Sequence, residues 1–190
     1  QNVLTFDEGV EWGGIYSIIS YHDSIYIGGD FQSASSAVNT RHFAIWNGYG
    51  WQSTYLGQVN GSVYDFCTIR DTLYMAGNFE QIGSLACIKI AAYTGSQWIN
   101  IGSLGMWARA IESFNGELYA GGYWGVRRYL GGTSWETLSV VPNDYVFALE
   151  ADTINTFLFV GGQFTMIGGQ ESFGVAMWDG FDWTAMGNDN

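Results

Sequence analysis

The apolar residues of this chain occur in short runs separated by turn residues, and the runs recur in a fixed order. One run in each repeat contains a glycine pair or its Ala-Gly equivalent, within residues 25–31, 73–79, 118–124 and 158–164. The pairs begin at Gly28, Ala76, Gly121 and Gly161, so they are 48, 45 and 40 residues apart. Self-similarity at such a period is typical of proteins built from stacked repeats.

Three further apolar elements accompany each glycine-containing run. One precedes it and begins at residue 15, 63, 108 or 146, a second follows it, and a third is short and starts at a tryptophan, Trp51, Trp98, Trp135 or Trp183. These runs are rich in Ile, Val, Tyr, Phe and Trp, which favour β-strands. Turn dipeptides such as Asn47-Gly48 and Asp179-Gly180 separate them and suit tight hairpins.

Each repeat therefore predicts a four-stranded antiparallel meander, and four meanders of this length are typical of β-propeller blades. We predict a single all-β domain over residues 1–190, with blades at about 15–57, 63–102, 108–139 and 146–187. Because one blade cannot hide both faces of its sheet, the blades must stack face to face. Glycine in the second strand allows close approach of a side chain from the next blade, and the four tryptophans are expected to wedge between blades.

The N-terminal residues predict an additional strand. Residues 9–15 align with residues 57–63, which link the last strand of one unit to the first strand of the next. Residues 2–8 are therefore expected to form an orphan last strand, although the fourth unit already has its own. We predict that the four blades belong to a larger ring whose other blades come from further sequence or from another chain. The alternative is a four-bladed ring with a redundant N-terminal strand.

The repeated segments carry a resemblance to a known family. LYMAGNF, LFVGGQF and VAMWDGFDW resemble the VGG-F…A-W-G…W-LG repeats of kelch-like bacterial secreted β-propeller proteins, from about Gly9 to Gly187. The resemblance implies an extracellular or cell-surface location after removal of a signal peptide, and an origin as cargo of a type IX secretion system. The third repeat departs from the pattern, because Trp124 runs almost directly into Val126.

Composition narrows the function classes. The chain has 6 Lys and Arg against 18 Asp and Glu, a net charge of −12, so no basic surface for nucleic acid or anionic membranes is expected. The chain contains no run of 18 apolar residues, so no membrane-spanning helix is predicted. Cys67 and Cys87 are too few for a disulfide-rich fold; they form either one bridge or, as we expect, two partly buried thiols.

Catalytic and metal signatures are weak. The two histidines, His22 and His42, lie at different levels of the repeat, which disfavours a zinc site. Glu112 and Glu150 occupy equivalent positions in adjacent blades and are the candidates for a glycosidase carboxylate pair. We predict no metal site, although oxygen ligands that would suit calcium are scattered along the chain at Asp7, Glu8, Asp30, Asp71, Asp179, Asp182 and Asp189.

Binding is the remaining function class. Aromatic residues in turns and inter-blade links are candidates for a contact surface, namely Trp12, Tyr49, Trp107 and Phe181, and Arg109 pairs with Trp107. We predict a non-catalytic interaction or adhesion module that binds a protein partner, such as secretion or surface machinery. The alternatives are a glycan-binding propeller and a glycoside hydrolase that uses Glu112 and Glu150.

Overall fold

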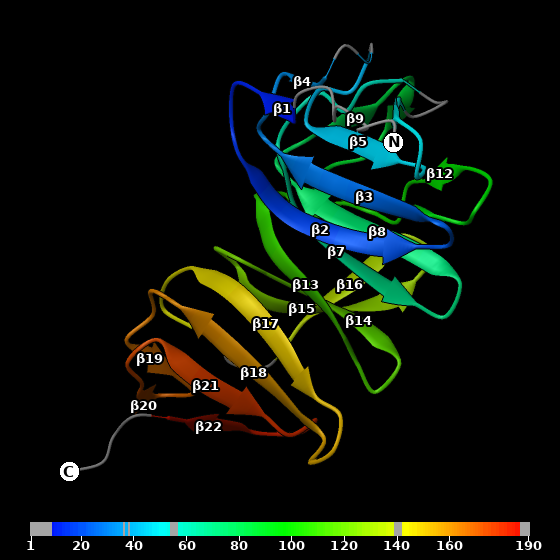
Figure 1. Cartoon of the computed structure of the whole chain (residues 1–190). Helices are drawn as coiled ribbons and strands as arrows, with labels where there is room; N and C mark the ends of the chain where they lie inside the picture. The colour runs from blue at the N-terminus through cyan, green and yellow to red at the C-terminus, as the bar shows by residue number, and fades with distance from the viewer. Residues whose placement is uncertain (1–8, 36, 38, 54–56, 139–141, 187–190) are drawn as a thin grey trace.

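The computed structural model describes residues 9–35, 37, 39–53, 57–138 and 142–186. Every regular element within these ranges is a β-strand (Figure 1). The strands agree with the elements expected from the repeats, so the prediction of an all-β chain built from four-stranded antiparallel sheets is confirmed.

Each repeat folds into one antiparallel sheet whose strands lie in chain order. Sheet 1 contains β2 (Ile15–Tyr21), β3 (Ser24–Gly29), β5 (Phe43–Trp46) and β6 (Trp51–Gln52). Sheet 2 contains β7 (Val63–Ile69), β8 (Thr72–Gly77), β11 (Ile90–Tyr93) and β12 (Trp98–Ile99). Sheet 3 contains β13 (Ala108–Phe114), β14 (Glu117–Gly122), β15 (Gly125–Gly131) and β16 (Ser134–Thr137). Sheet 4 contains β17 (Val146–Asp152), β18 (Phe157–Gly162), β21 (Val175–Trp178) and β22 (Trp183–Ala185).

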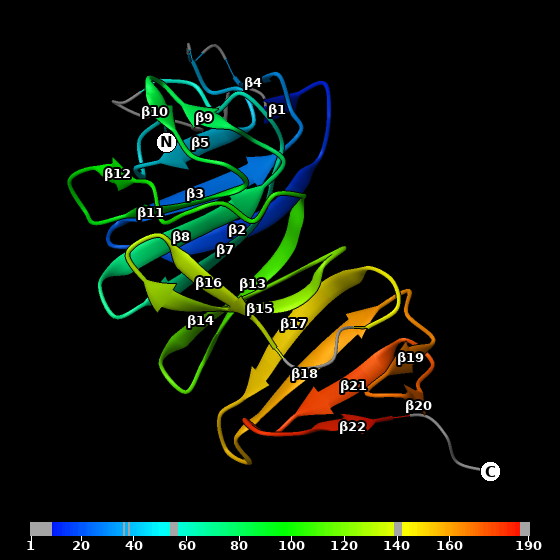
Figure 2. The ribbon, with the colours of Figure 1, turned by 180° about the vertical axis from the view of Figure 1, so that it is seen from behind.

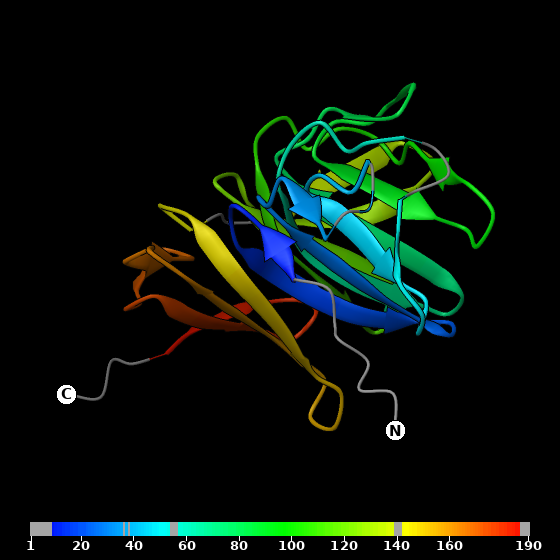
Figure 3. The same cartoon turned by 45° about the horizontal axis from the view of Figure 1, so that its top comes forward.

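The first strand of each sheet lies on the inside of the molecule, and we call these four strands the inner strands. They pack against one another in the order β2, β7, β13 and β17 (Figures 1 and 2). Among the strands that the structure describes, no packing of comparable extent joins β17 back to β2. The sheets therefore form an open series that is compatible with propeller blades, with sheet 4 at one end (Figure 3).

The hydrophobic core lies between consecutive sheets. Phe43 of sheet 1 meets Phe66 and Trp98 of sheet 2, with ring centroids 5.9 and 5.7 Å apart. A second cluster joins sheets 2 and 3, and a third joins sheets 3 and 4. Sheets 2 and 3 therefore have apolar contacts on both of their faces. Burial of apolar surface stabilises such contacts by roughly 25 cal/mol per Å².

Two glycines, Gly28 and Gly121, lie where the second strand of one sheet contacts the first strand of the next sheet. A Cβ atom at Gly28 would lie 2.4 Å from Val63 Cγ1, and one at Gly121 would lie 2.6 Å from Val146 Cγ1. The first residues of β7 and β17 thus fill the space of the missing side chains. At the same position sheet 2 has Ala76, which shares a buried cluster with Ala108, so a larger receiving residue is matched by a smaller first residue.

All four inner strands carry a β-bulge near their second residue. The register with the second strand shifts between the first and third residues of β2, β7, β13 and β17. A bulge leaves one residue out of the pairing and re-aims its side chain. The second residue of each inner strand is therefore free to point away from the sheet-to-sheet core.

A half-buried carboxylate links three inner strands. Asp65 of β7 accepts hydrogen bonds from Ser17 Oγ (3.1 Å), from its neighbour Phe66 N (2.9 Å) and from Ile111 N (2.9 Å). Burial raises the pKa of Asp65 above its ordinary 3.8, and the three donors oppose this rise. Asp65 therefore ties β2 and β13 to β7 through polar contacts, at the cost of desolvating a charge.

The short ribbons between strands were not predicted from the sequence, whereas the missing connection of the third repeat was. Short two-stranded ribbons lie outside the four sheets: β1 (Val10–Glu11) with β4 (Ser33–Ala34), β9 (Gln81–Ile82) with β10 (Leu85–Ala86), and β19 (Met166–Ile167) with β20 (Gln170–Glu171). Sheet 3 has none between its second and third strands, where Gly122 pairs directly with Gly125. The expected orphan strand at residues 2–8 lies outside the described residues.

The two cysteines are free and buried, as expected for separate thiols. Two of the four tryptophans contact a neighbouring sheet or its linker: Trp98 meets Phe43, and Trp135 donates a hydrogen bond to the carbonyl of Ile101 at 2.8 Å. The other two contact the tryptophan opposite them in their own sheet, as the pairs Trp46–Trp51 and Trp178–Trp183.

The contact between Gly121 and Val146 predicts coupled effects of substitution on stability. Gly121→Ala overpacks the interface, and we expect a loss of about 2 kcal/mol in the free energy of unfolding. Val146→Ala leaves a cavity and costs a similar amount, about 2 kcal/mol. The double variant reproduces the Ala76–Ala108 pair, so its loss should fall at least about 1 kcal/mol short of the sum. Urea unfolding of the four proteins measures this coupling, and additive losses would contradict it.

Asp65 predicts a pH dependence of stability. A carboxyl whose pKa is raised in the folded state contributes stability that is present at low pH and is lost as the pH rises through the folded pKa. The free energy of unfolding of the unmodified protein, relative to Asp65→Asn, should therefore fall over the pH range above the ordinary carboxyl pKa of 3.8. Urea titrations of both proteins across this range test the sign. A difference that grows in favour of the aspartate with pH would show that its hydrogen bonds outweigh desolvation.

Candidate functional site

The four bulge residues of the inner strands line one pocket. Tyr16, Tyr64, Arg109 and Phe147 are each the second residue of their strand, and together they surround about 350 Å³. Each of the four sheets contributes one of these residues. We call this site the inner pocket.

Arg109 supplies the positive charge of the inner pocket. Its guanidinium carbon lies 4.3 Å from the centre of the Tyr64 ring and 5.5 Å from that of Trp107, distances at which a cation is attracted to an aromatic face. The Nε atom of Arg109 is buried and has no hydrogen-bond partner in the structure. Since buried donors are nearly always paired, this atom is an exception, and an acceptor could reach it only if the side chain moved.

Aromatic rings extend the pocket on both sides of Arg109. The Tyr16 and Tyr64 rings lie 5.7 Å apart on one side. On the other side, Tyr145 stacks on Phe147 at 5.7 Å and contacts Tyr123 at 4.9 Å. Tyr16, Tyr123 and Phe147 are exposed, so their faces are open to a bound molecule.

A carboxylate fixes the edge of this aromatic surface. Asp30 accepts a hydrogen bond of 2.5 Å from Gly14 N, and this bond, with a second from the Tyr16 side chain, lowers the pKa of Asp30. The hydrogen bond to Asp30 in turn raises the pKa of Tyr16. Tyr16 is thereby held as a neutral phenol beside the pocket.

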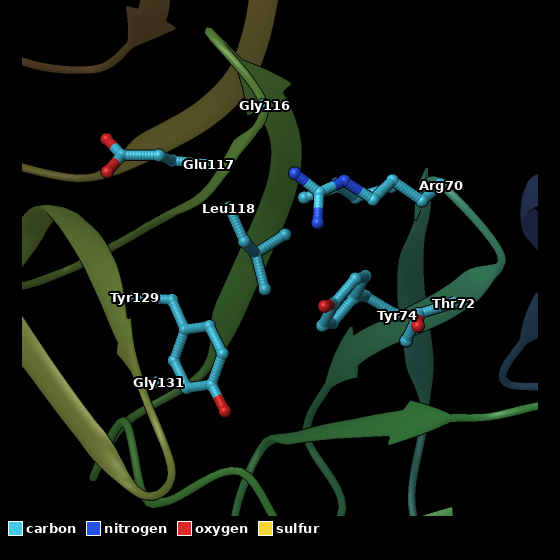
Figure 4. A pocket seen from close by; sticks show the side chains of 9 residues that line it. Arg70, Thr72, Tyr74, Gly116, Glu117, Leu118, Tyr129 and Gly131 are labelled. Carbon is cyan, nitrogen blue, oxygen red and sulfur yellow. The ribbon is translucent and has the colours of Figure 1, made fainter.

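A second pocket lies at the opposite end of the inner strands, between sheets 2 and 3. It encloses about 280 Å³ and is lined by nine residues, among them Arg70, Tyr74, Leu118 and Tyr129. Figure 4 shows the Arg70 side chain extended over this pocket toward Leu118. The Tyr129 hydroxyl already donates to the carbonyl of Gly132. This pocket involves only two sheets, so the inner pocket is the stronger candidate.

The structure brings together only two of the binding residues named from the sequence. Trp107 and Arg109 are in contact beside the inner pocket. Tyr49 and Phe181 are exposed at equivalent turns of sheets 1 and 4, and the side chains of Asn47 and Asp179 hold those turns. Trp12 is also exposed, with a backbone φ of 46°. None of Trp12, Tyr49 and Phe181 lines the inner pocket.

The two candidate catalytic carboxylates lie on adjacent inner strands, Glu112 on β13 and Glu150 on β17. Glu112 is half-buried and accepts a hydrogen bond from Ser113 N at 2.7 Å. Burial raises the pKa of Glu112; the Ser113 hydrogen bond opposes this, and the nearby charges of Glu150 and Asp65 add to it. Glu150 is exposed. Neither carboxylate lines the inner pocket.

Within the described part of the chain, no group of three or more His, Cys, Asp and Glu residues is arranged to hold a metal ion. Three of the acidic residues considered for calcium make other contacts: Asp30 binds Gly14 N, Asp71 accepts from His22 at 2.7 Å, and Asp179 accepts from the N–H groups of its own turn. Asp7, Glu8 and Asp189 lie outside the described residues.

Three residues of the inner pocket, Tyr16, Tyr64 and Phe147, were missed by the sequence analysis. The available signal was their shared place in the aligned repeats, directly after Ile15, Val63 and Val146. Strict alternation of strand side chains would have assigned them to a sheet face. Only the bulge, which the sequence pattern did not indicate, turns them toward a common pocket.

Comparison with known proteins adds no identity to these observations: no family model and no curated protein matches the chain. No helix long and apolar enough to cross a membrane occurs in the described ranges.

Proposed function

We propose that this chain is a non-catalytic β-propeller module that binds a glycan in the inner pocket. The four similar sheets, stacked through their first strands, support the propeller assignment. The resemblance of the repeats to kelch-like secreted proteins supports a role in adhesion or interaction at the cell surface, as cargo of a type IX secretion system. We also propose that the complete ring contains further blades besides these four.

The observation that carries the ligand class is the composition of the inner pocket. Exposed aromatic faces such as those of Tyr16 and Phe147 match the apolar face of a sugar ring, and Arg109 can donate to a hydroxyl or carboxylate oxygen. Small-molecule sites generally combine such apolar walls with few polar groups. The net charge of −12 disfavours highly anionic ligands but is screened beyond about 8 Å in physiological salt.

A protein partner is the second candidate function. It is favoured by the exposed aromatic residues in the outer turns, Tyr49 and Phe181, which lie apart from the inner pocket. Large apolar side chains exposed at turns are suited to docking onto another protein. The two candidates thus use different residues, and substitutions can separate them.

Binding to a glycan array tests the primary proposal. Arg109→Gln removes the cation and Tyr64→Ala removes the ring beneath it, and we expect each to weaken binding of a positive glycan about tenfold. The matched controls are Tyr49→Ala and Phe181→Ala, which should leave the dissociation constant unchanged. Calorimetry with the best glycan supplies the constants. An array without positive glycans, or binding that depends on the control residues instead, would reject the inner pocket as the site.

A hydrolysis assay separates binding from glycosidase activity. Glu112 and Glu150 lie on adjacent strands but outside the inner pocket, so we expect the bound glycan to be recovered intact. Glu112→Gln should leave binding unchanged within about twofold, because no contact from Glu112 to the pocket is needed. Release of new reducing ends, lost in Glu112→Gln and Glu150→Gln, would instead support a glycoside hydrolase that uses this pair.

A further inference from the structure

The first and fourth residues of an inner strand form the projecting half of each sheet-to-sheet interface. In sheets 2, 3 and 4 these residues pack on the preceding sheet and are at most 8% exposed: Val63 and Phe66, Ala108 and Ile111, Val146 and Leu149. In sheet 1 the same positions are Ile15, 46% exposed, and Ile18, 66% exposed. Among the described residues, no partner sheet lies over this projecting part of sheet 1.

The other half of each interface, which we call the receiving half, is centred on the small residue of the second strand, at position 28, 76, 121 or 161. The residue of the third strand that pairs with it is at most 1% exposed in sheets 1, 2 and 3, at Phe43, Ile90 and Val126. In sheet 4 this residue is Val175, and it is 43% exposed. A Cβ atom at Gly161 would have only Ala148 of its own sheet nearby, at 3.6 Å. Sheet 4 thus presents an empty receiving face.

The two end faces are complementary halves of an interface that the chain already forms three times. The internal pairs are Gly28 with Val63, Ala76 with Ala108, and Gly121 with Val146. At the ends, Ile15 is a larger projecting residue and Gly161 is a receiving position without a side chain. Within the described chain Ile18 and Val175 stay exposed, and no packing of comparable extent joins β2 to β17.

We propose that the occupant of each end face is a second copy of this chain, bound head to tail. Ile15 and Ile18 of one copy pack on Gly161 and Val175 of the other, which continues the established interface between sheets. Two such contacts related by a two-fold axis close a ring of eight sheets, a number within the range of known propellers. The inference does not depend on the ligand proposed for the inner pocket.

The chemistry of the two faces sets the conditions of association. On sheet 1 the exposed apolar residues lie on the inner strand β2. Ile27 of β3 and Ala44 of β5 are buried within their own copy. The contact with a second copy is therefore confined to the inner part of the sheet. The receiving face adds the aromatic ring of Phe159, which is half-buried. Each copy carries a net charge of −12, so like-charge repulsion should weaken association at low salt and screening should strengthen it.

Sedimentation equilibrium over a range of protein concentrations tests the proposal. The expected mass is twice 21.0 kDa, with association that tightens as salt is raised. Ile18→Asp removes the projecting face and Val175→Asp removes the receiving face, and each alone should raise the dissociation constant at least about tenfold, because a charge is buried unpaired. Ile154→Asp, at an exposed turn of sheet 4, is the matched control and should retain the double mass. Circular dichroism and cooperative unfolding confirm that each variant is folded.

Mixing the two disrupting variants distinguishes head-to-tail from face-to-face association. The mixture of Ile18→Asp with Val175→Asp retains one intact projecting face and one intact receiving face, so a two-copy species should reappear only on mixing. Either variant forming dimers by itself would overturn the proposal in favour of like-with-like contact. A single-copy mass at the highest concentration, or species larger than two copies, would overturn it as well.

Discussion

The fold depends on one repeated contact, in which an inner strand places an apolar residue on the small residue of the preceding sheet. A four-stranded sheet with two apolar faces is not stable alone in water, so each sheet must be covered on both sides. The glycine or alanine at positions 28, 76 and 121 allows the sheets to approach closely enough for this cover. Where the contact is missing, at the two ends, the chain exposes Ile18 and Val175.

The candidate site is a consequence of the same inner strands. Their bulges turn four side chains out of the sheet-to-sheet core and toward one pocket. The strands are held in place by the packing contacts and by Asp65, whose carboxylate receives hydrogen bonds from β2 and β13. The relative positions of Tyr64 and Arg109 therefore depend on interfaces that contain neither side chain, and loosening the sheets would disturb the pocket.

Charge and aromatic content divide the molecule into two regions of different chemistry. At the second residues of the inner strands, rings and Arg109 face an open pocket. Deeper along the same strands, burial raises the pKa values of Asp65 and Glu112, and raises that of the Cys67 thiol to about 12. Burial disfavours the charged form of each of these three groups.

The sequence by itself determined the strands, their order within each sheet and the small residues at positions 28, 76 and 121, because these follow from local pattern and from repetition along the chain. It also placed Trp107 beside Arg109. It did not indicate the bulges that gather Tyr16, Tyr64 and Phe147, nor the ribbons between strands, because a shift of register depends on how strands pair across the sheet. Only the tertiary structure decided which faces are covered: Ile15 and Val63 occupy the same place in the repeat, and the presence of a neighbouring sheet alone makes one exposed and the other buried.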